Sequence, residues 1–283
     1  MSDTPGLPQT SLPTLSVSIV VYFPDTAWLT ATYESLVAAL VHARRVGAVG
    51  RAKVCLVDNG ATGSTSPSGA ELEKLCLAFD WVEASTIAGQ GNIGYGRANN
   101  LAIAHCHDAE FHLVLNPDVK LDDDALANAL NYFRLHPECA MISPVATAPH
   151  GEELYLAKRF PDLLTLALRG FAPRSLQNIF RARLDHYEHR DSRFDAGLND
   201  VQIASGCFML VRMDALLRTE GFDPAFFLYF EDFDLSYRIS KFAAIARVPD
   251  VRIVHAGGSA AAKGWRHRWL FIQSALRFLW KHR

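Results

Sequence analysis

Residues 225–238 place acidic side chains among aromatic ones, and they are the residues of this chain best suited to acid-base chemistry. Three acids fall within four positions there, namely Glu231, Asp232 and Asp234. The aromatic residues around them are Phe226, Phe227, Tyr229, Phe230, Phe233 and Tyr237. A carboxylate against an apolar wall has a raised pKa, which makes it a better general base near neutral pH. The alternative is a plain helix start, where acids favour the positive end of the dipole and the aromatics are core.

Polar side chains also follow three predicted strands. Asp58 closes the run 53–57, a glycine-rich segment from Asn92 to Asn100 follows 81–87, and Asn116-Pro117-Asp118 closes 111–115. In a parallel α/β sheet, ligands collect at these strand ends. Asp58 can accept from a base imide, the glycine-rich turn can offer amides to phosphate, and Asp118 can bind Mg²⁺ or Mn²⁺ beside a diphosphate. The alternative for both aspartates is an ordinary turn.

Gly89, Gly91 and Gly94 match the spacing of a dinucleotide fingerprint between a predicted strand and a helix. Because of this spacing, a nicotinamide-dependent oxidoreductase is an alternative function for the chain. Against it, the fingerprint normally follows the first strand of its unit, whereas this one follows the third. No strand ends in an acid at the expected distance either.

Strand and helix patterns alternate along the first half of the chain. Buried strands are predicted at 16–23, 53–57, 81–87, 111–115 and 139–145, with helices at 26–44, 71–79, up to about 106, and 121–136. We expect helices and a mobile loop at residues 152–200. A strand interrupted at Ser205-Gly206 is predicted at 201–212, and a last strand is predicted at 251–255. The alternation indicates an α/β fold with a doubly wound, mostly parallel sheet.

The 283 residues are 49% hydrophobic and 20% charged, which is typical of a globular protein with a sizeable core. Five widely spaced cysteines, with no Cys-x-x-Cys pair and no secretory signal, predict reduced thiols in a cytoplasmic protein. Residues 1–15 resemble a flexible leader. No apolar run is long enough to span a bilayer.

The end of the chain is basic, because seven Lys or Arg and no acids follow Asp250. Residues 263–283 predict an amphipathic helix, with Trp265, Trp269, Ile272, Leu276 and Leu279 on one face. This tail either packs on the domain or lies on the anionic inner face of the cell membrane. Nucleic acid is not expected as a partner, because no stacking aromatics accompany the charge.

Taken in order, the motifs resemble those of bacterial family-two glycosyltransferases, and the rhamnosyltransferase-like group that builds cell-surface glycans is the most similar. They cover roughly residues 16–259. The matching segments are Val17 to Val21, Asp58-Asn-Gly60, Asn92 to Asn100, Asn116 to Asp118, Ser205-Gly206, Gly221 to Asp223, Phe227 to Arg238, and His255 to Ser259.

The resemblance implies a GT-A type fold that transfers a sugar, with inversion, from a nucleoside-diphosphate donor. The resemblance also implies that the GT-A catalytic domain covers residues 16–262. Its nucleotide-binding half is expected at about 16–150 and its acceptor-binding half at about 151–262, and the C-terminal helical tail follows. It implies nucleotide-sugar contacts from Asp58, Asn92, Gly94, Arg97, Asn100, Asn116 and Gly206. Asp118, with His255, would hold the divalent metal, although Asn116 replaces the first acid of the family's Asp-x-Asp.

Asp232 matches the family's catalytic base, and Glu231 would orient it or bind the acceptor. Inverting transfer needs one base for the acceptor hydroxyl and a positive centre for the leaving diphosphate. We therefore expect a metal-assisted glycosyltransferase that moves L-rhamnose from dTDP-rhamnose to a glycan or polyprenyl-linked acceptor. The remaining alternatives are the oxidoreductase and a non-catalytic sugar-nucleotide-binding module.

Overall fold

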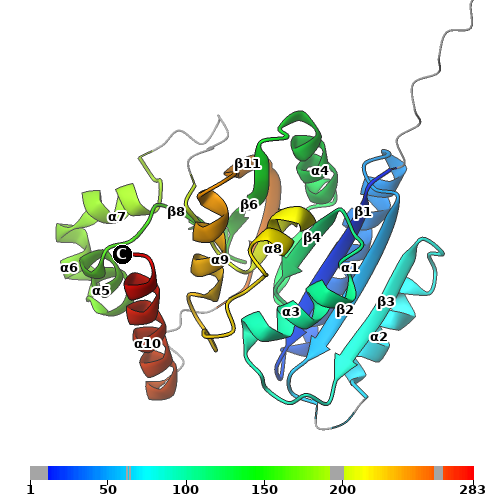
Figure 1. Ribbon diagram of the computed structural model, residues 1–283, viewed down its shortest axis with the longest axis horizontal. Helices are drawn as coiled ribbons and strands as arrows, with labels where there is room; N and C mark the ends of the chain where they lie inside the picture. Colours follow the sequence, from blue (N-terminus) through cyan, green and yellow to red (C-terminus); the bar gives the residue numbers. More distant parts are fainter. Residues whose placement is uncertain (1–11, 62, 64, 192–200, 258–263) are drawn as a thin grey trace, which may run out of the picture.

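The structure is a computed structural model that describes residues 12–61, 63, 65–191, 201–257 and 264–283. Most of the predicted leader, and Gly258 and Ser259 of the last motif, lie outside these residues. One large mixed sheet forms the centre of the described chain, with helices on both faces and a group of helices at one end (Figure 1).

The elements follow the alternation expected from the sequence. The strands are β1 (Thr14–Val21), β2 (Arg51–Asp58), β3 (Val82–Ala88), β4 (Phe111–Leu115), β5 (Val119–Leu121), β6 (Cys139–Thr147), β7 (Glu153–Leu154), β8 (Ala157–Lys158), β9 (Ile203–Ala204), β10 (Phe208–Arg212) and β11 (Ala244–His255). The helices are α1 (Thr26–Arg45), α2 (Pro67–Cys76), α3 (Tyr95–His105), α4 (Ala125–Leu135), α5 (Leu163–Phe171), α6 (Arg174–Ile179), α7 (Arg181–Tyr187), α8 (Met213–Arg218), α9 (Glu231–Ser240) and α10 (Trp265–Lys281).

The large sheet has the strand order β3-β2-β1-β4-β10-β6-β11-β5, with β7 paired to β6. The neighbours of β1 and β2 are parallel, and β11 is parallel to β6. The strand β10 is antiparallel to both β4 and β6, between which it lies. The polar ends of β2 and β4 therefore lie at the same edge as the turn that precedes β10.

Each face of the sheet has its own apolar layer. Along β1, Val17 and Ile19 point into the core shared with α1, α2 and α4, whereas Val20 points to the α3 side. Helices α8 and α9 pack on that second face (Figure 1). This two-sided burial explains why β1 reads as a continuous apolar run.

Fully buried polar side chains connect β1, β4 and α3 on the second face. The two ring nitrogens of His112 contact Ser16 Oγ at 2.8 Å and Ser18 Oγ at 3.0 Å. Ser18 Oγ donates to Asn99 Oδ1 at 2.7 Å, and Asn99 Nδ2 donates to the Tyr95 carbonyl at 3.1 Å. Burial lowers the pKa of His112 to about 3, so the imidazole is neutral in the folded protein. The network fixes the start of α3 on the sheet.

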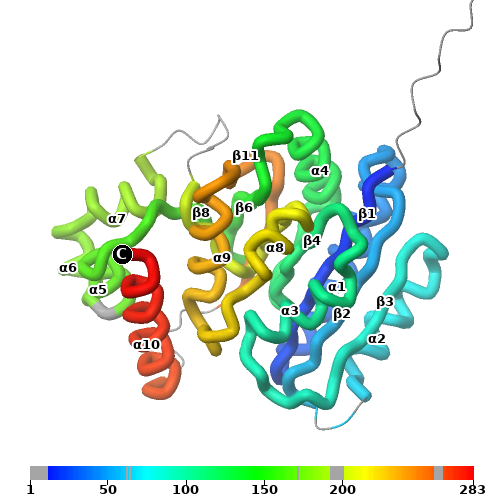
Figure 2. Tube along the Cα trace, viewed as in Figure 1, coloured from blue at the N-terminus to red at the C-terminus, as the bar shows by residue number. Residues whose placement is uncertain are grey.

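Helices α5, α6, α7 and α10 form a separate group at one end of the molecule (Figure 2). Leu166 of α5 and Phe278 of α10 share an apolar cluster with Phe226 and Phe230. The fully buried carboxylate of Asp234 in α9 contacts Lys281 Nζ at 2.6 Å and His282 Nε2 at 2.8 Å, and accepts from Arg238 Nε at 2.7 Å. Because breaking a buried ion pair costs about 3–5 kcal/mol, this carboxylate is a strong tie between α9 and α10.

The structure differs from the sequence expectation at some element ends. Helix α2 begins at Pro67, earlier than expected, because Ser66 accepts from Gly69 N as N-cap and proline suits the first turn. The expected helix 121–136 begins only at Ala125, because Leu121 belongs to β5 and pairs with Ile253 of β11. The strand expected at 251–255 begins at Ala244.

The strand expected at 201–212 is interrupted at Ser205-Gly206, as predicted. Before the interruption β9 pairs with β8, and after it β10 belongs to the large sheet. All five cysteines are free and buried. Among the helices of the described residues, none combines the length and apolar character needed to cross a membrane.

His112 should make stability fall with acid. Its pKa is about 3 in the folded protein and 6.5 when unfolded, so the unfolded state binds the proton first. The unfolding free energy should therefore decrease by up to about 1.4 kcal/mol per pH unit below pH 6.5, until about pH 3. Denaturant unfolding at neutral pH and at about pH 5 measures this change.

His112→Gln keeps a polar side chain that does not titrate, and it should reduce the acid-dependent loss. His107→Gln, at an exposed histidine, is the matched control and should retain it. An equal pH dependence in wild type and His112→Gln would contradict the assignment.

Candidate functional site

Asp232 lies at the start of α9, where two backbone amides hold its carboxylate. Gly206 N donates to Oδ2 at 2.7 Å and Phe233 N donates to Oδ1 at 2.9 Å. A Cβ added to Gly206 would lie 3.0 Å from Asp232 Cβ, so this close approach favours glycine. Burial raises the pKa of Asp232, while the Gly206 amide and the Lys158 charge oppose the rise. The net result is a raised pKa on a carboxylate that remains partly exposed, which suits a general base.

Glu231 has a different environment although it is the adjacent residue. Its side chain is 4% exposed, and Oε2 has no hydrogen-bond partner among the described residues. Burial, and then the charge of Asp232, raise the pKa of Glu231 to about 8. Two neighbouring carboxyl groups in such a site do not both ionise easily. At neutral pH the proton therefore resides mainly on Glu231, and Asp232 carries the charge.

The turn before these acids is strained. Tyr229 and Phe230 have φ of 69° and 66°, in the left-handed region that bulky residues rarely adopt. Phe230 is the residue at which α9 begins, and its ring is buried against Phe233 and Phe271. Such strain persists only where packing enforces it, and it is common at functional sites. The aromatic residues of this stretch therefore fix the direction in which the acids enter α9.

Tyr95 connects the Asp232 side of the site to the end of β4. Its hydroxyl lies 2.8 Å from Asn116 Oδ1 and 2.8 Å from the Gly206 carbonyl. Asn116 N also donates to the Cys207 carbonyl at 2.9 Å. The turn 205–207 therefore contacts both the base candidate and the Asn116-Pro117-Asp118 motif.

Asp118 and His255 lie together beyond Asn116. His255 Nε2 is 3.3 Å from Asp118 Oδ1, and Ala256 N donates to the Asp118 carbonyl at 3.0 Å. Burial lowers the pKa of His255, but Cys207 and Asp118 outweigh burial and raise it to about 10. A Cβ on Gly257 would lie 2.4 Å from the His255 ring, so a larger residue here would displace that ring.

These two side chains fit a divalent metal as part of a ligand set. Asp118 Oδ1 is buried and has no good hydrogen-bond partner among the described residues, as an oxygen directed at a cation would be. No cluster of three or more His, Cys, Asp or Glu side chains arranged for a metal occurs in the described part of the chain. Mg²⁺ and Mn²⁺ commonly take few protein ligands and complete their shell with phosphate oxygens and water. The pair therefore suits a metal that binds together with a diphosphate.

Asp58 lies at the end of β2, nearly buried, and organises the loop that follows. Its Oδ1 accepts from Gly60 N at 2.8 Å and from Ala61 N at 3.0 Å, and Oδ2 accepts from Ser66 Oγ at 2.5 Å. The turn-forming role considered from the sequence is therefore present. Beside this loop, Tyr22 and Phe23 at the end of β1 are 55% and 75% exposed.

The glycine-rich segment makes fewer amides available to a phosphate than expected. Asn92 Oδ1 accepts from Gly94 N at 3.1 Å, and Tyr95 N donates to the Phe227 carbonyl at 3.1 Å. Gly94 has φ of 92°, and an added Cβ would lie 2.4 Å from that carbonyl. The segment is thus closely docked on the acid-aromatic stretch. It also follows the edge strand β3, away from the central position that a dinucleotide fingerprint occupies.

Arg97 and Asn100 of α3 bind the segment 222–224. Arg97 Nε donates to the Pro224 carbonyl at 2.9 Å. Asn100 accepts from Phe222 N at 2.8 Å and donates to the Phe222 carbonyl at 2.7 Å. Both side chains therefore position the chain that leads to Asp232.

The structure joins Asp232, Gly206, Asn116, Asp118 and His255 through direct or shared contacts. Asp58 and Asn92 lie along the same edge of the sheet. Gln90, two residues before Asn92, donates to the Asp58 carbonyl at 3.0 Å and to Asn59 Oδ1 at 3.2 Å.

Sequence reasoning missed three residues of this site, namely Tyr95, Lys158 and Cys207. Tyr95 stands inside the quoted glycine-rich motif and Cys207 directly follows Ser205-Gly206, so both had a nearby signal. Lys158 had none, because only the pairing of β8 with β9 brings it close to Asp232.

Comparison with curated proteins finds rhamnosyltransferases. The chain is 25% identical over 217 residues to the N-acetylglucosaminyl-diphospho-decaprenol L-rhamnosyltransferase of Mycobacterium tuberculosis H37Rv, a match that covers 71% of this chain and 66% of that protein. It is 28% identical over 160 residues to rhamnosyltransferase WbbL of Escherichia coli K12, covering 53% and 55%. The chain thus spans less than two thirds of either relative. No family model matches the chain.

Solved structures share its fold at low sequence identity. The mannosyltransferase PcManGT from Pyrobaculum calidifontis, in complex with GDP-Man and Mn²⁺, superposes with a TM-score of 0.62 at 18% identity over 96% of this chain and 65% of that one. GalNAc-T7 with UDP, GalNAc and Mn²⁺ gives a TM-score of 0.59 at 14% identity over 86% and 43%. The fold is therefore the GT-A fold of glycosyltransferases, and the resemblance to the rhamnosyltransferase-like group is confirmed by the relatives that the sequence matches.

Proposed function

We propose that this protein is an inverting glycosyltransferase that moves L-rhamnose from dTDP-rhamnose to a glycan or polyprenyl-linked acceptor in cell-surface polysaccharide synthesis. The observation that carries the proposal is the site itself, where Asp232 connects through Gly206 and Tyr95 to the Asn116-Pro117-Asp118 motif. The rhamnosyltransferase relatives support the sugar, and the decaprenol-linked substrate in the name of one of them supports a lipid-linked acceptor.

Asp232 is the general base in this proposal. It takes the proton of the acceptor hydroxyl as the oxygen attacks the anomeric carbon from the side opposite the leaving diphosphate. Two amide donors keep its carboxylate ionised and oriented. Glu231 remains protonated at neutral pH, and it prevents a second negative charge from forming beside the base. No carboxylate nucleophile is needed in a single displacement.

The donor occupies the ends of β1, β2 and β4, in the nucleotide-binding half of about 16–150. Asp58 and Asn92 lie at the base end, where the exposed rings of Tyr22 and Phe23 offer a stacking surface. Asn116, Gly206 and Gly94 line the path toward the diphosphate. Arg97 and Asn100 support the pocket through the segment 222–224.

Asp118 and His255 would hold Mg²⁺ or Mn²⁺, which would supply positive charge for the departing diphosphate. The Mn²⁺ in two structures of the same fold supports this choice of metal. Since His255 must be neutral to bind a metal, binding there releases a proton. The acceptor enters from the half at about 151–262, next to Asp232. We place the protein in the cytoplasm, where nucleotide sugars and reduced cysteines are expected.

A sugar-nucleotide-binding module without catalysis is the second candidate, because Asp118 and His255 give only two protein ligands. An acceptor-dependent release of nucleotide decides between the two functions. The oxidoreductase is disfavoured by the edge position of β3 and by the use of the Gly94 and Tyr95 amides within the protein.

A panel of ligands should identify the donor. Binding to the folded state raises the melting temperature by mass action, so dTDP-rhamnose with Mn²⁺ should stabilise the protein more than UDP-sugars, NAD or NADP. Thermal shift measured with and without Mn²⁺ tests this. Stabilisation by NAD alone would overturn the glycosyltransferase assignment.

Asp232→Asn and Glu231→Gln should have opposite outcomes at neutral pH. Asp232→Asn removes the base and should lower transfer by about 10²-fold or more, with donor binding nearly unchanged. Glu231→Gln imitates the protonated acid and should keep most of the activity, because the pKa of Glu231 is about 8. Nucleotide release and donor thermal shift measure the two effects.

Asp214→Asn, at an exposed acid on α8, is the control and should behave as wild type. A dead Glu231→Gln together with an active Asp232→Asn would assign the base to Glu231 instead.

Asp118→Asn should remove the metal dependence of donor binding. The loss of a carboxylate ligand should weaken Mn²⁺ by about tenfold or more, because the second protein group is a single imidazole. The measurement is the melting-temperature shift by the donor across a Mn²⁺ titration. Asp123→Asn, an exposed acid in the same segment, should titrate as wild type does. An unchanged Mn²⁺ titration in Asp118→Asn would place the metal elsewhere.

A further inference from the structure

The group of helices α5, α6, α7 and α10 exposes large apolar side chains that have no part in the site described above. Those that are most exposed are Ile179 and Trp265 at 77%, Trp280 at 72%, Leu163 at 60%, Leu276 at 54% and Trp269 at 52%. They come from two segments that are about a hundred residues apart in sequence. An exposed apolar patch of this kind, surrounded by polar residues, marks an interaction surface.

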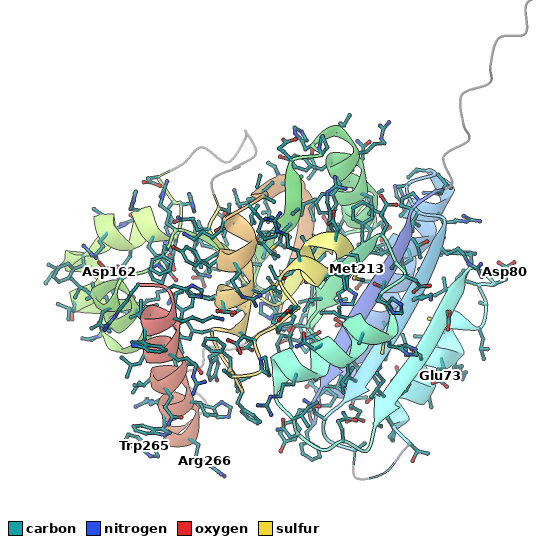
Figure 3. All side chains as sticks on the ribbon, in the orientation of Figure 1. Glu73, Asp80, Asp162, Met213, Trp265 and Arg266 are labelled. Atoms are coloured by element: carbon teal, nitrogen blue, oxygen red, sulfur yellow. The ribbon has the colours of Figure 1, made fainter. Side chains whose placement is uncertain are left out.

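Both segments are basic. Residues 163–187, which contain α5, α6 and α7, have four arginines and one acid, Asp185, and residues 264–283 contain five Lys or Arg and no acid. Arg174, Arg266 and Arg277 are exposed and form no ion pair with any described residue. Figure 3 shows Trp265 and Arg266 pointing outward from the first turn of α10. The surface therefore combines apolar side chains with unneutralised positive charge.

The two segments are neighbours in the fold. Leu166 and Phe278 share a cluster, and a Cβ added to Gly170 of α5 would lie 3.3 Å from the Phe271 ring of α10. The buried side of α10 is formed by Ser274, Ala275 and Phe278, so its other side remains in water. One side of the tail helix α10 thus packs on the domain, and its other side is exposed to solvent. From the sequence, packing on the domain and contact with a membrane were alternatives, but this arrangement is compatible with both.

A cleft of about 590 Å³ between the segments does not explain the charge as a discrete anion site. Most of its cations already have partners, since Arg183 pairs with Asp162, Arg159 with Asp191 and His282 with Asp234. A phosphate in the cleft would have to compete with those carboxylates. Arg174, Arg266 and Arg277, which form no ion pair with a described residue, do not line the cleft.

We propose that the surface formed by α5, α6, α7 and α10 docks on an anionic lipid bilayer. Apolar rings and branched chains enter the boundary between headgroups and acyl chains, while arginines contact lipid phosphates. A second copy of the chain fits poorly, because two such surfaces would place the unpaired Arg174, Arg266 and Arg277 of one copy against those of the other. Nucleic acid would satisfy the arginines but leave Leu163 and Ile179 in water.

The proposal concerns a composite surface, and it is independent of the reaction. If α10 alone bound the membrane, substitutions in α6 would not weaken membrane binding. The double variant Arg174→Gln/Ile179→Gln changes only α6, and Trp269→Gln/Arg277→Gln changes only α10. Arg51→Gln/Leu77→Gln, on β2 and α2 at the opposite end of the molecule, is the matched control (Figure 2).

Co-sedimentation of the full chain with phosphatidylglycerol-containing vesicles, and with phosphatidylcholine vesicles, tests the proposal. Wild type and the control should bind the anionic vesicles, and added salt should weaken binding. Each surface variant should bind about fivefold more weakly or worse, as the loss of one basic residue near an anionic membrane predicts. The donor-induced thermal shift should be equal in all four proteins, which separates this proposal from the proposed function.

Equal binding by the α6 variant and wild type would overturn the composite surface. Equal binding to both kinds of vesicle would overturn the anionic bilayer as its partner. Sedimentation velocity that shows a dimer lost in the surface variants would assign this face to self-association instead.

Discussion

The hydrogen bond from Gly206 N to Asp232 Oδ2 is the contact on which the rest of the site depends. It exists because a glycine lets the turn between β9 and β10 approach the start of α9 so closely that a Cβ on Gly206 would lie 3.0 Å from Asp232 Cβ. The same turn offers its carbonyl to Tyr95, and the next residue, Cys207, contacts Asn116 and His255. One short turn therefore sets the relative positions of the proposed base and the proposed metal ligands.

The two adjacent carboxyl groups show how local environment divides chemical roles. Asp232 has two amide donors and remains partly exposed, whereas Glu231 is buried with an unpaired oxygen. Sequence position alone cannot distinguish them, since both follow the same aromatic residues. The strained turn at Tyr229 and Phe230 makes the distinction, because it determines which side chain faces the glycine turn.

Much of the fold could be predicted from the sequence, because hydrophobic periodicity and turn residues are local signals. The α/β alternation, the GT-A type and the break at Ser205-Gly206 are all present in the structure. Element ends were harder, as Pro67 and Leu121 show, because capping and strand pairing decide them. The third acid of the stretch, Asp234, has a structural role, because its buried carboxylate contacts the end of α10.

The site could be predicted only where its residues stand in motifs. Asp232, Asn116 and Asp118 come from separate segments, and their connection through Tyr95 is a tertiary fact. Arg97 and Asn100 were expected to contact the nucleotide, whereas in the structure they bind the backbone of 222–224, a tertiary contact that no sequence pattern reveals. Lys158 reaches the base only through a two-residue strand pairing, which has no distinctive sequence pattern.

The insertion of β10 between β4 and β6 has a consequence for how the chain folds. Until residues 208–212 are available, β4 and β6 have no common neighbour and each leaves an edge unpaired. Such open edges slow folding and invite pairing with other chains. During synthesis, β4 and β6 therefore keep exposed edges until residues 208–212 have been made. We expect a chaperone to matter most for the chain in this period.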